Sequence, residues 1–157
     1  MESYVLELQM MMCKGLVRLL AGLDAADRLK RPPRNTFTEE EQNFWQRFGV
    51  FHVCRHPPAL SYADFAQHTR VDGVPPQQLL AAAAECFKEV RGKVAGLLGL
   101  PPGIVSPEQF ADLTGMDKVA AANATATRLV EMPGVCVDFD YKHHPVFATV
   151  VIRREKK

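Results

Sequence analysis

Hydrophobic positions at the start of the chain repeat with the period of a helix. Residues 3–22 carry two apolar stripes at spacings of three and four residues, which predicts one α-helix. The first stripe consists of Val5, Leu8, Met12, Leu16 and Leu19, and the second of Leu6, Met10, Cys13, Val17 and Leu20. The remaining polar strip, Glu7, Lys14 and Arg18, is narrow, so we expect this helix to be buried on several sides. Since termini are usually exposed, such a buried helix at the start looks like the middle of a longer protein.

Helix start and stop signals recur further along the chain. Thr38 with Glu41 has the form of a capping box before a helix that ends near Phe48. Ser106, with proline next and Gln109 at the third position, starts another helix, which we expect to break at Gly115. The other predicted helices span residues 61–69, 76–98 and 117–130.

Residues 135–152 change to the pattern of β-strands. Val135 to Tyr141 alternates between apolar and polar positions, and Val146 to Ile152 is rich in β-branched residues. A two-stranded hairpin is marginal alone, so we expect this tail to dock on helices or on another chain. The predicted fold class is mainly α: one domain over residues 1–157, a bundle or array of five to six helices with a small C-terminal β-hairpin or extended tail.

Composition narrows the class of protein without naming a function. The chain has 157 residues, enough for one domain with a real core. Lys and Arg number 19 against 18 Asp and Glu, so the net charge of +1 gives no general attraction to nucleic acid or membrane. No apolar run reaches the roughly 18 residues of a membrane span. Glu2 and Glu7 argue against a signal peptide, and we expect a cytoplasmic protein with free thiols.

Catalytic and metal-binding patterns are weak throughout. The closest cysteines, Cys54 and Cys86, lie 32 positions apart, so there is no C-x-x-C pair. His52, Cys54 and His56 are zinc-type ligands, but alternate residues of a loop seldom supply three ligands to one tetrahedron. The same residues would be the centre of a Cys/His thiol enzyme, which is the less favoured alternative. We expect no catalytic residue, no metal, no cofactor and no small-molecule substrate.

Two polar segments near the C-terminus either have a function or are only solvated surface. His143 and His144 precede a proline and are expected in a solvated turn. Residues 153–157 form a basic tail, which either contacts RNA or the ribosome through phosphates or only adds solubility. An RNA- or ribosome-contacting helical module is therefore the alternative to a protein-binding scaffold.

Three segments together resemble a known family. Residues 2–11, ESYVLELQMM, and 13–22, CKGLVRLLAG, are the densest part, and Lys118-Val119-Ala120 with Asn123 and Leu129 is the middle part. The ending FDY at 139–141, followed by His144, Phe147, Val150 and Val151, is the last part. These segments resemble the C-terminal region of the large auxiliary subunit of the NatC N-terminal acetyltransferase. The similarity is thin between about residues 24 and 74.

The resemblance implies a non-catalytic scaffold. The family's complex acetylates an N-terminal Met that is followed by a bulky hydrophobic residue. Its large subunit binds a catalytic acetyltransferase subunit and a small Sm-like subunit and helps to hold the assembly at the ribosome. We expect helix 3–22 and tail 135–152 to make such contacts. The candidate interaction residues are Leu8, Met12, Leu16, Phe139, Tyr141, Phe147 and Val150.

Overall fold

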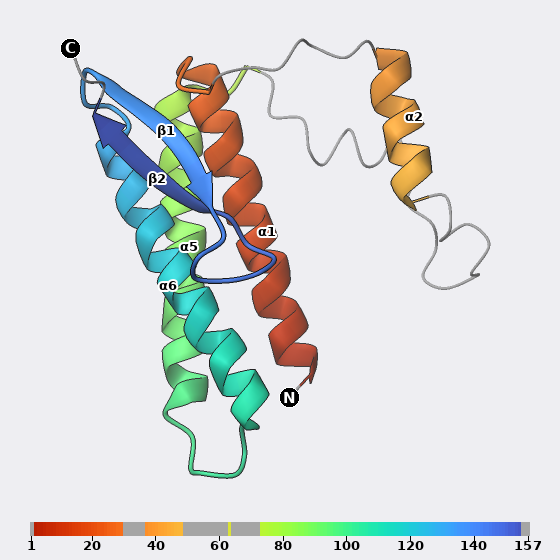
Figure 1. Ribbon diagram of the computed structural model, residues 1–157, viewed down its shortest axis with the longest axis vertical. Helices are drawn as coiled ribbons and strands as arrows, with labels where there is room; N and C mark the ends of the chain where they lie inside the picture. Colours follow the sequence, from red (N-terminus) through yellow and green to blue (C-terminus); the bar gives the residue numbers. More distant parts are fainter. Residues whose placement is uncertain (1, 30–36, 49–62, 64–72, 155–157) are drawn as a thin grey trace. The chain divides into compact units, whose positions relative to one another are not determined.

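The protein is mainly helical with a small C-terminal hairpin. The computed structural model describes residues 2–29, 37–48, 63 and 73–154 (Figure 1). The elements are helices α1 (Glu2–Ala25), α2 (Phe37–Phe48), α5 (Pro76–Leu98) and α6 (Pro107–Leu129) and strands β1 (Val135–Asp140) and β2 (Thr149–Arg154). The predicted fold class is therefore confirmed. Residues 1–29 and 74–157 form one compact unit, and α2 belongs to a second unit, residues 30–73.

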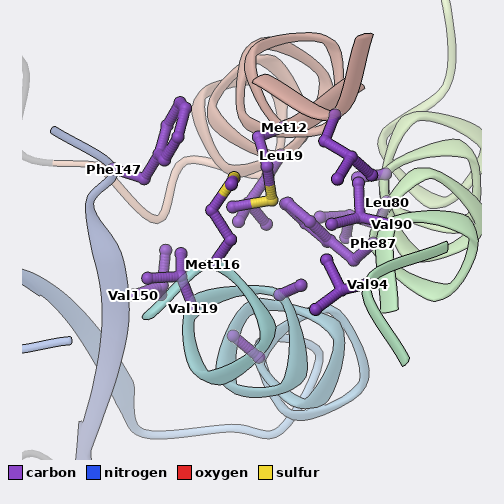
Figure 2. Packing of buried hydrophobic residues seen from close by; sticks show 14 of the residues in the cluster. Met12, Leu19, Leu80, Phe87, Val90, Val94, Met116, Val119, Phe147 and Val150 are labelled. Carbon is purple, nitrogen blue, oxygen red and sulfur yellow. The ribbon is translucent and has the colours of Figure 1, made fainter. Parts of the chain in front are cut away.

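Three long helices run up, down and up in the larger unit (Figure 1). Helix α5 lies antiparallel to α1, because Lys93 near its end meets Glu7 while Leu80 near its start meets Gly22. Phe87, Val90 and Val94 of α5 are fully buried between the helices (Figure 2). Burial of apolar surface stabilises a fold by about 25 cal/mol per Å². The core shared by the three helices is therefore the main source of stability of this unit.

Two glycines let α1 approach α5 closely. A Cβ atom on Gly15 would lie 2.8 Å from Cε1 of Phe87, and one on Gly22 would lie 2.9 Å from Cδ2 of Leu80. Gly15 and Gly22 are seven residues apart, which puts them on the same face of the helix. This face of α1 is therefore the one that packs against α5.

Helix α6 begins as the sequence predicts but does not break. The Ser106 hydroxyl accepts the N–H of Gln109, and the Gln109 side chain accepts the N–H of Ser106, which is a complete capping box. The prediction of a break at Gly115 and a new helix from Asp117 is wrong, because α6 is continuous. Gly115 instead makes room for the hairpin loop: a Cβ there would lie 2.7 Å from the carbonyl oxygen of His143.

Asn123 attaches the hairpin to α6. The two strands pair antiparallel, with Val135 opposite Arg154 and Phe139 opposite Val150. The Asn123 amide donates to the Ala148 carbonyl at 3.0 Å and accepts the Val150 N–H at 2.8 Å. The fully buried Asn123 side chain therefore satisfies one donor in β2 and one acceptor just before it, as a neighbouring strand would.

His144 organises the loop between the strands, and the predicted solvated turn holds for the exposed His143 but is wrong for His144. Its ring is buried rather than solvated, and its Nδ1 accepts the N–H groups of Val146 and Phe147 at 3.1 and 3.2 Å. The ring proton is therefore on Nε2, which donates to Asp112 Oδ1 at 2.8 Å. Because Val146 and Phe147 fold back onto His144, β2 starts at Thr149 and not at Val146.

Helix α2 confirms the predicted helix of the smaller unit and begins at Phe37. Phe44 is buried, and its ring meets that of Trp45 edge to face, with centroids 5.3 Å apart. The Trp45 indole N–H donates to Glu41 Oε1 at 3.4 Å. The predicted helix 61–69 and the His52, Cys54 and His56 string lie outside the described residues.

Candidate interaction surface

The first apolar stripe of α1 is used by the protein's own core. Leu8 and Met12 are buried against α5 and α6, and Leu16 is partly buried beside them. Figure 2 shows Met12 and Leu19 pointing into the space between the three helices. These side chains therefore hold the bundle together, and their predicted role in contacts to another protein is not tested by the structure.

The second apolar stripe of α1 faces outward, and we call it the α1 seam: Leu6, Met10, Cys13, Val17 and Leu20. The exposed fractions are 59% for Leu6, 72% for Met10, 37% for Val17 and 39% for Leu20. Cys13 is an exposed free thiol at the centre of the seam. A row of exposed apolar side chains along one helix is the kind of surface that binds another protein.

The candidate residues of the tail divide in the same way. Phe147 and Val150 are buried, facing Met116 and Val119 of α6 (Figure 2). Phe139 and Tyr141 are exposed, at 38% and 60%. The buried pair anchors the hairpin, whereas the exposed aromatic pair remains available for contact with a partner.

Sequence reasoning recognised both stripes of α1 but chose its candidates from the buried one. Both stripes have the same length and similar hydrophobicity, so periodicity alone does not rank them. Gly15 and Gly22 are the signal that could have decided, since glycines seven residues apart mark the face that lies against another helix.

Charged groups frame one side of the α1 seam. Lys93 of α5 pairs with Glu7 and with Glu89, and the hydrogen bond that its ammonium donates to the Glu7 carboxylate raises the pKa of Lys93. Arg18 donates from Nη1 to the Cys86 sulfur at 3.0 Å. Among the described residues, no carboxylate pairs with Lys14 or Arg18. This edge of the seam therefore carries positive charge.

Other candidate chemistry is sparse in the part of the chain that the structure describes. There, no three His, Cys, Asp or Glu side chains gather as a metal-binding group. The described helices include none with the length and apolarity needed to cross a bilayer. Arg153 of the basic tail is paired with Asp138 at 3.1 Å, and residues 155–157 lie outside the described residues.

A helical bundle that leaves one long apolar helix face open is typical of a protein–protein interaction module. The comparison with protein families agrees: residues 1–150 match the family described as NAA35-like, TPR repeats. The chain belongs to this NAA35-like family, which is a family of auxiliary, non-catalytic subunits. No curated protein matches the chain.

Proposed function

We propose that the chain is a non-catalytic scaffold in a co-translational N-terminal acetyltransferase of the NatC type. The observation that carries the proposal is the family match over residues 1–150, nearly the whole chain. The helical bundle supports it, because stacked helices provide large, rigid surfaces for partner proteins. The resemblance of residues 2–22 and 139–151 to the large auxiliary subunit of NatC supports the particular complex.

The proposed partners are a catalytic acetyltransferase subunit and a small Sm-like subunit, and the proposed location is the cytoplasm, near the ribosome. The complex would act on an N-terminal Met followed by a bulky hydrophobic residue, with all the chemistry on the catalytic subunit. In this chain Phe139 and Tyr141 offer exposed aromatic contacts beside a firmly anchored hairpin. Aromatic side chains of this kind often dominate the energy of an interface.

Co-purification tests this proposal. The tagged chain and the catalytic subunit from the same organism are expressed together, and the amount of catalytic subunit retained is measured. We expect retention by the wild-type chain and a clear loss in the double variant Phe139→Ser, Tyr141→Ser, whose exposed positions should leave the fold intact. Glu89→Lys is the matched control at an exposed position and should retain the partner. Failure of the wild-type chain to retain the catalytic subunit would contradict the proposal.

A further inference from the structure

The α1 seam has the geometry that accepts a second helix. Its residues follow spacings of four, three, four and three, which is a repeat of 3.5 residues. A 3.5-residue repeat keeps an apolar row straight along a partner helix that crosses at about 20°. The seam lies on the opposite side of α1 from Gly15 and Gly22, which face α5. An α-helix could therefore lie along it without disturbing the bundle.

The size of the α1 seam limits what binds there. Leu6 and Met10 are more than half exposed, and Val17 and Leu20 more than a third. Together they offer roughly a few hundred Å² of apolar surface, which is the size of a functional patch. A stable interface usually needs about 800 Å² from each partner, so the seam alone is too small to hold a second copy of this chain. It fits a helix that is also held by other contacts within an assembly.

The charge beside the α1 seam determines which charge a partner helix should carry. Lys14 is exposed next to Cys13, and Arg18 lies one turn further along the same edge. The negative charge of Glu7, also on this edge, is already offset by Lys93. Uncompensated positive charge on the flank of an apolar seam favours acidic residues on the flank of the partner helix.

From this apolar row and its basic flank we propose that the α1 seam binds an amphipathic α-helix of a partner subunit, with acidic residues opposite Lys14. The seam side chains would interdigitate with the apolar row of that helix, and Cys13 would be covered at the centre. The inference rests on the proposed scaffold function for the source of the helix.

Two synthetic peptides test the α1 seam directly. Both are 21-residue helices with Leu at every a and d position; one has Glu and the other Lys at the e and g positions. We expect the Glu peptide to bind the chain about threefold or more tightly than the Lys peptide, because a few exposed ion pairs each add a fraction of a kcal/mol. Met10→Lys should weaken both peptides by at least roughly tenfold, since it places an unpaired ammonium in the contact.

Charge variants separate the flank from the apolar row. Lys14→Glu should remove or invert the preference for the Glu peptide while leaving binding to the apolar row. Lys118→Glu is the matched control, because this exposed lysine lies on α6, away from the seam. Cys13 is a second readout: bound peptide should slow its reaction with a thiol reagent, followed by mass mapping so that the other cysteines are distinguished.

Several results would overturn the proposal. One is failure of both peptides to bind while Cys13 reacts freely, and another is equal weakening by Met10→Lys and Lys118→Glu. Protection of Cys13 in the free chain, or a doubled mass in sedimentation that Met10→Lys abolishes, would show that the chain itself covers the seam. If the Met10→Lys variant still co-purifies with the catalytic subunit, only the proposed role of the α1 seam is rejected. If the peptides bind but the wild-type chain does not co-purify with the catalytic subunit, only the proposed function is rejected.

Discussion

Alanine at Gly115 places a methyl group between α6 and the hairpin loop, where the structure leaves no room. The new Cβ would lie 2.7 Å from the carbonyl oxygen of His143, and 3.2 Å from Cδ2 of His144. Carbon–oxygen contacts in proteins are normally at least about 3.3 Å, so the loop would have to retreat by roughly 0.6 Å. It does not retreat freely, because His144 is tied to Asp112 and to two backbone N–H groups.

The change in the free energy of unfolding caused by Gly115→Ala is the sum of two opposing effects. Replacing a helical glycine by alanine gains about 0.5–1 kcal/mol, because alanine has less backbone entropy to lose. Overpacking a close contact costs about 1–3 kcal/mol. We expect Gly115→Ala to lower the free energy of unfolding by about 1–2 kcal/mol after this offset. For a chain of this size, that corresponds to a melting temperature lower by roughly 2–8 °C.

Gly92 provides the matched control. It lies in the interior of α5 on the exposed side, and a Cβ there would meet nothing within 4 Å. Gly92→Ala should therefore raise stability by about 0.5–1 kcal/mol, so that one substitution has opposite signs at two helical sites. Urea unfolding followed by circular dichroism at 222 nm measures both. If Gly115→Ala is as stable as Gly92→Ala, the loop does not pack on α6 at Gly115 and our account of the hairpin is wrong.

Three further substitutions, with one exposed control, test the hairpin anchor, the core and a helix cap. Asn123→Ala leaves two backbone groups without partners, the buried Val150 N–H of β2 and the partly buried Ala148 carbonyl just before it, and should cost about 2–5 kcal/mol in urea unfolding; a loss below about 1 kcal/mol would show that Asn123 does not anchor the hairpin. Leu8→Asp buries an unpaired carboxylate and should prevent cooperative thermal unfolding, whereas Glu89→Lys at an exposed position should change stability by no more than about 0.5 kcal/mol. Ser106→Ala removes the α6 cap and should cost about 1 kcal/mol, and an unchanged unfolding midpoint would show that the cap contributes nothing.

The helix boundaries were largely readable from the sequence because their causes are local. Pro76 opens α5, and Ser106 with Gln109 opens α6, through groups no more than four residues apart in the chain. The period-two pattern from Val135 likewise placed β1 correctly. A mainly helical fold with a C-terminal hairpin therefore follows from short-range propensity and capping alone.

The tertiary structure decided everything that depended on contact between distant segments. Local propensity predicts a helix break at Gly115, but α6 continues through it. The glycine is needed there because the loop at His143, 28 residues later, packs against it. His144 has the sequence context of a solvated turn, yet Asp112 and the loop backbone satisfy its ring inside the protein. Hydrophobic periodicity did not rank the two stripes of α1, because the buried one is decided by which face meets α5; Gly15 and Gly22 are the sequence signal of that face. This packing buries Leu8 and leaves Met10 open to a partner.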